Sequence, residues 1–134
     1  GPLAPLITRD CTLPLLTVLY ASREGGVAAR VAQEPPVVTV ADRLQEVAQA
    51  KSCALLEKWQ QDFAARAAFL ASLGKEERVM DLTDGLRMTL TDGDVIHVRP
   101  SGNAPELRLY VETNEITSAE ALLGMALLQI KKTL

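Results

Sequence analysis

Two Asp-Gly pairs, Asp84-Gly85 and Asp92-Gly93, interrupt a stretch of the chain in which apolar and polar residues alternate from Arg78 onward. An Asp-Gly pair supplies the positive-φ backbone that a two-residue hairpin requires, and a period of two is typical of strands with one buried face. The apolar positions form four runs, at 79–82, 86–90, 96–98 and 107–111. This stretch therefore predicts four consecutive antiparallel strands in a meander.

A helix is predicted ahead of these strands. Asp42 and Gln45 have the spacing of a capping box, and apolar residues recur at helical spacing from about Ser52 until Gly74. We expect this stripe to lie in the core, because apolar stripes at helical spacing are buried far more often than they bind ligands. The stripe consists of Leu56, Trp59, Phe63, Ala67 and Leu70.

A second helix is predicted after the strands. It starts at Thr117 or Ser118, with Glu120 in capping-box position to Thr117, and two lysines lie near its negative C-terminal end. The residues that it is expected to bury are Leu123, Leu127, Ile130 and Leu134.

The first 36 residues are expected to stand apart from this pattern. Asp10 can cap a helix that has Pro14 in its opening turn and ends near Gly25-Gly26. Its expected buried residues are Leu13, Leu16 and Leu19 or their neighbours.

The fold class follows from the order of these elements. Pro35-Pro36 breaks the chain, and Val37 to Val40 is rich enough in β-branched residues to form a further strand. We therefore place a boundary at the prolines, with residues 1–36 as a helical tail and hinge and residues 37–134 as a domain. The order β-α-β-β-β-β-α predicts an α+β domain, in which an antiparallel sheet of four to five strands carries two helices on one face.

A small polar loop lies between the last two predicted strands. Arg99 ends one strand and Arg108 lies within the next, while a hydroxyl, a glycine backbone and a side-chain amide come between them. Pro100 and Pro105 bracket the loop and lower the entropy that is lost when an anion binds. A phosphate ester needs forked donors and accessible backbone N–H groups, so the loop predicts a phosphate site. Its candidate residues are Arg99, Ser101, Gly102, Asn103 and Arg108.

The run from Arg99 to Arg108, Arg-Pro-Ser-Gly-Asn-Ala-Pro-Glu-Leu-Arg, resembles the signature of the C-terminal domain of the α-D-phosphohexomutases, the phosphomannomutase and phosphoglucomutase enzymes. The resemblance extends through residues 81–87 and 92–98, and residues 8–16 look like the last helix of the family's third domain. Ala104 and Glu106 depart from the family's usual Glu and basic residue, and these changes bear on sugar preference and binding strength.

The resemblance implies a TATA-binding-protein-like fold for residues 37–134, with residues 1–36 as the end of the preceding α/β domain. It implies a parent enzyme that interconverts hexose 6-phosphate and hexose 1-phosphate with Mg²⁺ and a hexose 1,6-bisphosphate, and that works with a hexose phosphate substrate. Here the loop from Arg99 to Asn103 would hold the non-reacting phosphate. The family's serine, magnesium and sugar-recognition motifs do not occur in this chain. We therefore expect it to need the N-terminal domains of the same enzyme and to be inactive alone; a stand-alone sugar-phosphate-binding module is the alternative.

Charge and hydropathy exclude other functions. A net charge of −3 gives no general attraction to nucleic acid or to an anionic membrane. Tyr110 is the single aromatic residue on the predicted strands, whereas nucleic-acid platforms stack bases on several. No apolar stretch reaches the roughly 18 residues that a membrane helix needs. We therefore expect a cytoplasmic protein with no nucleic-acid or membrane partner.

Other chemistry-bearing residues are given structural roles. Asp92-Gly93-Asp94 is expected to form a hairpin turn and not a metal site, because valine, isoleucine and histidine follow it where a metal loop needs another carboxylate. His97 is expected to be a packed or hydrogen-bonded strand residue. Cys11 and Cys53 are too few for a disulfide framework or a metal knuckle, so both are expected to be reduced, partly buried thiols.

Overall fold

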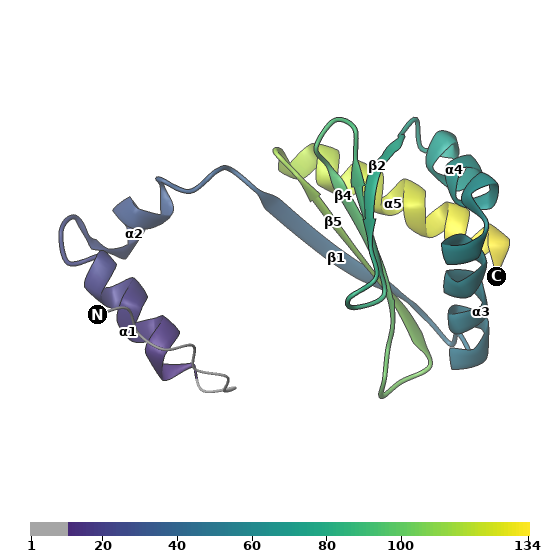
Figure 1. The fold of residues 1–134 in the computed structure, drawn as a ribbon, viewed down its shortest axis with the longest axis horizontal. Helices are drawn as coiled ribbons and strands as arrows, with labels where there is room; N and C mark the ends of the chain where they lie inside the picture. Colours follow the sequence, from purple (N-terminus) through teal and green to yellow (C-terminus); the bar gives the residue numbers. More distant parts are fainter. Residues whose placement is uncertain (1–10) are drawn as a thin grey trace. The chain divides into compact units, whose positions relative to one another are not determined.

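The computed structural model describes residues 11–134, which fall into two units that divide between Pro36 and Val37. The first unit contains helix α1 (Thr12–Ala21) and helix α2 (Gly26–Val31) (Figure 1). A single helix was expected here, and that prediction is wrong. Gly25 and Gly26 have φ values of 90° and 81°, so the chain turns there and a second helix begins. The expected N-cap, Asp10, lies outside the described residues.

The apolar side chains of α1 are exposed. Leu13, Leu16 and Leu19, which were expected to be buried, are 40%, 56% and 59% exposed. Each unit is compact by itself, and a helix of ten residues has too few neighbours in so small a unit to cover its apolar surface.

The second unit is built on a five-stranded antiparallel sheet with the strand order β1-β5-β4-β3-β2. The four strands of the predicted meander are therefore consecutive neighbours, and the remaining strand is added at the edge beside β5. This confirms the predicted α+β class. The strands are β1 (Val38–Gln45), β2 (Glu77–Asp81), β3 (Leu86–Leu90), β4 (Val95–Pro100) and β5 (Glu106–Thr113).

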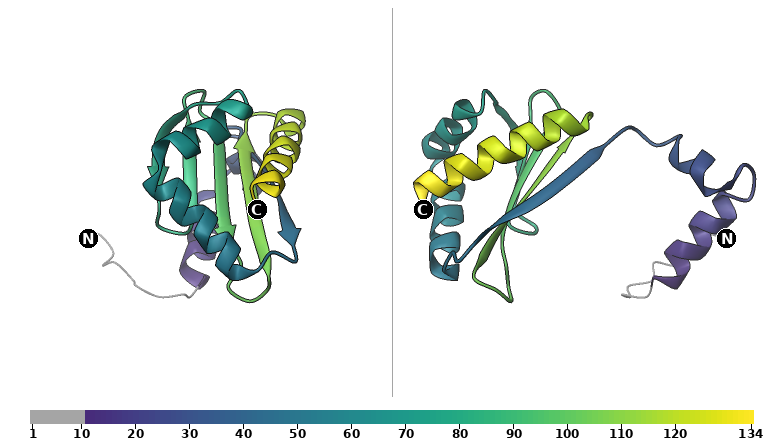
Figure 2. Two further views of the ribbon diagram at one scale, coloured as in Figure 1. Left: turned by 90° about the vertical axis from the view of Figure 1, so that its right-hand side faces the viewer. Right: turned by 180° about the vertical axis from the view of Figure 1, so that it is seen from behind.

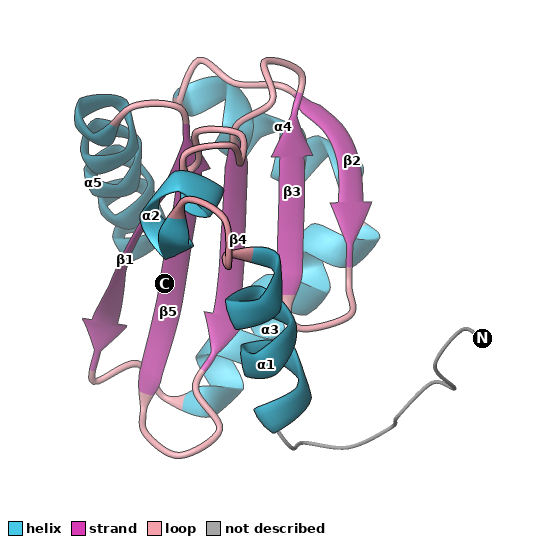
Figure 3. Cartoon of the chain, turned by 90° about the vertical axis from the view of Figure 1, so that its left-hand side faces the viewer, coloured by secondary structure: helices cyan, strands magenta, loops and turns pink. Residues whose placement is uncertain are grey.

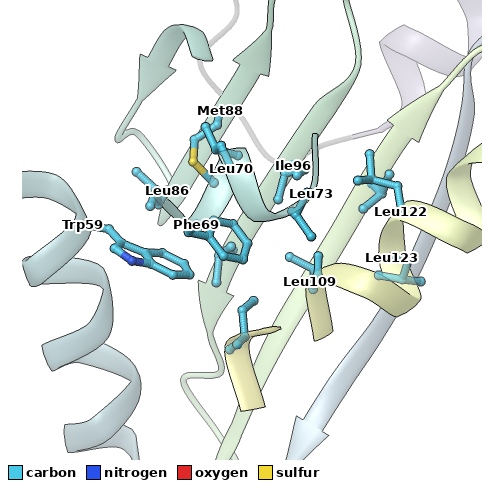
Figure 4. Close-up of a cluster of buried hydrophobic side chains, with 14 of the residues drawn as sticks. Trp59, Phe69, Leu70, Leu73, Leu86, Met88, Ile96, Leu109, Leu122 and Leu123 are labelled. Carbon is cyan, nitrogen blue, oxygen red and sulfur yellow. The ribbon is translucent and has the colours of Figure 1, made fainter. Parts of the chain in front are cut away.

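Three helices cover one face of this sheet, as the left-hand view of Figure 2 shows. They are α3 (Gln49–Gln61), α4 (Phe63–Ser72) and α5 (Ile116–Thr133). Leu107, Leu109 and Val111 of β5 point into the core, so their neighbours in sequence lie on the opposite face. Figure 4 shows the core between sheet and helices, where the rings of Trp59 and Phe69 stack with centroids 4.3 Å apart.

The predicted capping box of Asp42 and Gln45 is wrong. Both residues belong to β1, which pairs with the whole of β5, from Val38 opposite Thr113 to Gln45 opposite Glu106. A continuous ladder satisfies the backbone groups of the entire segment, whereas a cap satisfies two of them. The strand therefore runs past Val40, and α3 starts after Ala48.

The long helix expected up to Gly74 is broken at Asp62, whose backbone is extended (φ −109°, ψ 96°) and whose carboxylate accepts the Ala65 N–H at 3.0 Å to cap α4. A buried arginine, Arg66 of α4, links the two helices on either side of the break. Its guanidinium donates to the Trp59 carbonyl and pairs with both carboxylate oxygens of Glu77, at 2.6 and 3.0 Å. Because the helix is broken, the apolar residues before and after Asp62 no longer lie on one continuous helix face.

The consequence of this break is visible in the two aromatic residues that were expected to be buried. Trp59 is buried as predicted, whereas Phe63, the first residue of α4, is 66% exposed, so its predicted place in the core is wrong. Phe69 of α4 occupies that place against Trp59.

Helix α5 begins at Ile116 without a side-chain cap, so the predicted box of Thr117 and Glu120 is wrong. The Thr113 hydroxyl accepts the Glu115 N–H and donates to the Glu115 carbonyl, which turns the chain into the helix earlier. Of the residues expected to be buried, two are buried and the other two pack partly buried against the core. The buried pair is Leu123 and Ile130, and the partly buried pair is Leu127 and Leu134.

Candidate functional site

The β4–β5 loop, residues 101–105, and the β2–β3 turn, residues 82–85, lie at the same end of the sheet (Figure 3). This follows from the topology, because β2 and β4 are both antiparallel to β3 and therefore run in the same direction. β1 also ends here, since it is antiparallel to β5. Three connections of the sheet thus meet around the loop that was predicted to bind phosphate.

Backbone hydrogen bonds fix the shape of this loop. The Ser101 N–H donates to the Glu106 carbonyl at 2.9 Å and closes the loop, and the Val47 N–H donates to the Pro105 carbonyl at 2.9 Å. The second bond ties the loop to the segment between β1 and α3. Closing the loop uses the Ser101 amide, so this N–H group is not available to an anion.

Other donors of the loop stay available. Across residues 11–134, no protein acceptor takes the backbone N–H groups of Gly102 and Ala104. Ser101 is buried, and its hydroxyl oxygen lies 3.5 Å from the Asn103 nitrogen, at the limit of a hydrogen bond. The Asn103 side chain is exposed at the tip. The loop therefore presents two unused backbone donors and an exposed amide from a closed backbone.

Arg99, the last but one residue of β4, lies beside the loop and pairs with a residue that was not expected at the site. Its Nη1 atom is 2.8 Å from the Asp84 Oδ2 atom in the β2–β3 turn. The side chains are 39% and 61% exposed, so both remain in contact with solvent. Asp84 was interpreted only as a turn residue, and nothing in the local sequence indicates that it reaches across to β4.

Arg108 lies directly opposite Arg99, and Arg43 of β1 lies directly opposite Arg108. The three arginines form a row across the sheet face that is turned away from the helices. The Glu106 carboxylate is shared between two of them, at 3.4 Å from the Arg43 Nε atom and 3.9 Å from the Arg108 Nε atom. An open hollow of about 450 Å³ lies here, lined by Ala41, Asp42, Arg43, Arg108 and Tyr110.

The three arginines concentrate positive charge beside the loop, and like charges directly opposite one another repel. The structure places Arg108 beside Arg99, and next to Arg108 it places Arg43, which was not among the residues predicted from the sequence. Pairing between β1 and β5 places Arg43 there, and that pairing joins distant parts of the chain.

The histidine and the second Asp-Gly turn have the structural roles that were predicted. His97 Nε2 lies 2.5 Å from the Asp84 carbonyl oxygen, and its ring packs 5.5 Å from that of Tyr110. Asp92 and Asp94 both contact the Lys75 Nζ atom, at 2.5 and 2.7 Å. These contacts confirm a hydrogen-bonded strand histidine and a hairpin turn.

The Lys75 cluster shifts the acid–base equilibria of its members. Burial lowers the pKa of Lys75, but the hydrogen bonds to Asp92 and Asp94 outweigh it and leave that pKa raised. Burial likewise raises the pKa of Asp92, but the hydrogen bond and charge of Lys75, together with backbone N–H groups, outweigh it and leave that pKa lowered. Both shifts favour the charged forms, so the cluster acts as an ion-pair contact between the end of α4 and the β3–β4 hairpin.

The remaining polar groups supply no metal centre in the described part of the chain, where no group of three or more His, Cys, Asp and Glu side chains is placed to hold an ion. Cys11 and Cys53 are both free thiols, as predicted, but Cys11 is exposed and not partly buried. Among residues 11–134, no helix combines the length and the apolar character needed to cross a membrane.

Comparison with known proteins shows that the loop lies in a stretch of the chain that matches a protein family. Residues 27–125 match the profile described as "Phosphoglucomutase/phosphomannomutase, C-terminal domain". A phosphomannomutase of Salmonella muenchen is 34% identical over 135 residues, which cover 98% of this chain and 28% of that protein. A phosphomannomutase of Sinorhizobium fredii (strain NBRC 101917 / NGR234) is 35% identical over 127 residues, which cover 93% of this chain and 27% of that protein. The chain spans little more than a quarter of the length of these relatives.

Proposed function

Since the chain belongs to the phosphoglucomutase/phosphomannomutase family and matches its C-terminal domain, we propose that residues 37–134 bind a phosphate group of a hexose phosphate. The parent protein interconverts hexose 6-phosphate and hexose 1-phosphate, and this domain holds the phosphate that is not reacting. Holding the remote end of the substrate restricts the position of the reacting end, which lowers the entropic part of the barrier.

The observation that carries this proposal is the combination of Arg99 with the unused N–H groups of Gly102 and Ala104. A phosphate ester offers up to two negative charges and several acceptor oxygens, so it can accept from a guanidinium and from backbone amides at once. The closed loop holds these amides in place before the anion arrives, and less conformational entropy is lost on binding.

The binding test is a titration of the ¹⁵N-labelled chain with mannose 1-phosphate and with inorganic phosphate, followed by amide chemical shifts. We expect shifts centred on residues 99–104 and a dissociation constant on the order of millimolar, because ordering and association costs offset much of the hydrogen-bond energy. Arg99→Ala should abolish the shifts. Arg87→Ala is the matched control, since it removes the same charge from the neighbouring strand. Unchanged shifts in Arg99→Ala would contradict the proposal.

Catalysis is assigned to the part of the parent protein outside this chain. Mg²⁺ and the hexose 1,6-bisphosphate would act there, since Asp92 and Asp94 of the β3–β4 turn are engaged by Lys75. We expect no conversion of mannose 1-phosphate by the purified chain alone. A coupled assay that detects turnover by this chain would contradict the assignment.

Residues 1–36 are assigned to the preceding domain of the parent protein, with Pro35-Pro36 as the hinge. The exposed apolar side chains of α1, among them Leu15 and Leu19, support this assignment, because a helix that is apolar on its outer surface normally packs against a larger core. The predicted cytoplasmic location belongs to the same proposal.

A further inference from the structure

The β2–β3 turn is held against β4 by three contacts at the start of the phosphate loop. The Asp84 carboxylate pairs with Arg99, and the Asp84 carbonyl oxygen lies 2.5 Å from His97 Nε2. Gly85 packs so closely on β4 that a Cβ atom at this position would lie 2.6 Å from the Val98 carbonyl oxygen. The turn is thus positioned by the main chain as well as by the ion pair.

The ion pair itself is a weak source of stability. Both side chains are more than a third exposed, and exposed pairs contribute little because water and salt screen them. The pair nevertheless restricts the orientation of a long, flexible side chain. A guanidinium that is held in one orientation has less freedom to lose when it binds a second anion.

The pairing leaves most of the Arg99 donors unused. Asp84 contacts the Nη1 atom, and among the described residues no other protein acceptor bonds to this guanidinium. The edge formed by Nε and Nη2 is therefore available, and this edge matches two oxygens of a phosphate group. Asp84 thus engages one end of the guanidinium and leaves the Nε–Nη2 edge without a protein partner among the described residues.

We propose that Asp84 is a positioning residue for phosphate binding, which orients the Arg99 guanidinium toward the non-reacting phosphate. This inference rests on the proposed function, because it needs Arg99 to contact the phosphate. It deepens that function by adding the β2–β3 turn to the site, from a strand connection that lies outside the loop.

When the Asp84 carboxylate is removed, the direction in which phosphate affinity changes distinguishes a positioning role from simple electrostatics. Removing a carboxylate near an anion site lowers the repulsion of the anion, so general electrostatics predicts tighter phosphate binding. A positioning role predicts weaker binding in Asp84→Asn, because a neutral amide oxygen holds the guanidinium less strongly than a carboxylate does. Asp84→Asn is a small change, since Asn has nearly the shape of Asp and both residues are favoured in turns.

The experiment compares Asp84→Asn with Asp81→Asn in this chain, by titration with inorganic phosphate and with mannose 1-phosphate. The control removes the same charge three residues away, and its amide oxygen can still accept the Thr83 N–H that Asp81 binds at 2.7 Å. We expect the dissociation constant to rise about two- to fivefold in Asp84→Asn, the range set by the strength of an exposed pair. In Asp81→Asn the dissociation constant should equal that of the wild-type chain or be slightly lower.

A second readout reports on Arg99 directly and does not depend on a ligand. Rotation of the Arg99 guanidinium about its Nε–Cζ bond, followed by arginine side-chain NMR, should be slowed in the wild-type chain and in Asp81→Asn. It should be faster in Asp84→Asn, whose neutral amide binds the guanidinium less strongly, and Asp84→Glu should restore part of the restriction. A turn that served only to fold the hairpin would change neither this rotation nor the phosphate affinity.

The outcomes separate the two proposals. Phosphate affinity that is unchanged or tighter in Asp84→Asn, together with lost binding in Arg99→Ala, overturns the positioning role and leaves the phosphate site in place. Binding that persists in Arg99→Ala overturns the phosphate site. Guanidinium rotation that is as fast in the wild-type chain as in Asp84→Asn also overturns the positioning role.

Discussion

Gly85 and Gly93 allow a sharp test of how closely the β2–β3 turn packs on β4. Both are second residues of Asp-Gly pairs and both have positive φ, 83° and 95°. A Cβ atom on Gly85 would meet the Val98 carbonyl oxygen at 2.6 Å and the Arg99 Cα and Cβ atoms at 3.2 Å, whereas no atom lies within 4 Å of such a Cβ atom on Gly93. Replacing each by alanine therefore separates the cost of backbone conformation from the cost of the clash.

The expected magnitudes follow from these two terms. Placing an L-residue at positive φ costs about 1–2 kcal/mol, so Gly93→Ala should lower the free energy of unfolding by about that amount. Gly85→Ala carries the same cost and also forces β4 or the turn to move. Overpacking of this kind costs about 1–3 kcal/mol, which brings the expected loss to about 2–5 kcal/mol.

The assay is urea unfolding followed by the fluorescence of Trp59, the chain's single tryptophan, which is 2% exposed in the core of the second unit. Gly85→Ala should also shift the amide resonances of β4 around Val98 and Arg99. Two variants that are destabilised equally, within about 0.5 kcal/mol, would refute the close approach of the turn to β4.

Two further predictions concern the core and the lysine cluster. Leu109→Ala on β5, a fully buried site, should destabilise the domain by about 2–5 kcal/mol in the same assay; Leu128→Ala, on the exposed side of α5, should change stability by less than about 0.5 kcal/mol, and equal effects would contradict the assigned core. Because the pKa of Asp92 is lowered, the stability that its pairing contributes is present above the ordinary value of 3.8 and is lost as the pH falls below it. Because the pKa of Lys75 is raised, its contribution is present below 10.5 and is lost as the pH rises beyond it. Lys75→Met should therefore weaken the dependence of the urea unfolding midpoint on pH at both low and high pH. An unchanged dependence at low pH would count against the cluster.

The features that were predicted correctly from the sequence depend on neighbours along the chain. The four-strand meander and its hairpins at Asp84-Gly85 and Asp92-Gly93 are present because turn chemistry and alternation act over a few residues. The two-residue loops that the Asp-Gly pairs predicted are wrong, because four residues lie between the strands in each hairpin, 82–85 and 91–94. The candidate phosphate residues between Arg99 and Arg108, which remain a prediction, could be proposed from the sequence for the same reason, since a loop and its two flanking strands are contiguous. The resemblance of this run to the mutase family also agrees with the family that the comparisons show.

The predictions that failed depended on contacts between distant segments. Asp42 and Gln45 could cap a helix locally, but pairing with β5 extends the strand through both. The helix break at Asp62 depends on the contact between Arg66 and Glu77 of β2, and it places Phe63 in solvent. Local propensity is a weak preference that a long-range ladder or a buried ion pair can override.

The candidate site likewise has features set by neighbours along the chain and features set by contacts between distant segments. The sequence alone determined that Arg99 precedes the polar loop, because the two are joined covalently and keep their spacing in any fold. Only the tertiary structure decided that Ser101 uses its amide to close the loop, that Arg43 lies next to Arg108, and that Asp84 pairs with Arg99. Those contacts depend on which strands become neighbours, and burial of the shared core on the other face of the sheet selects that arrangement.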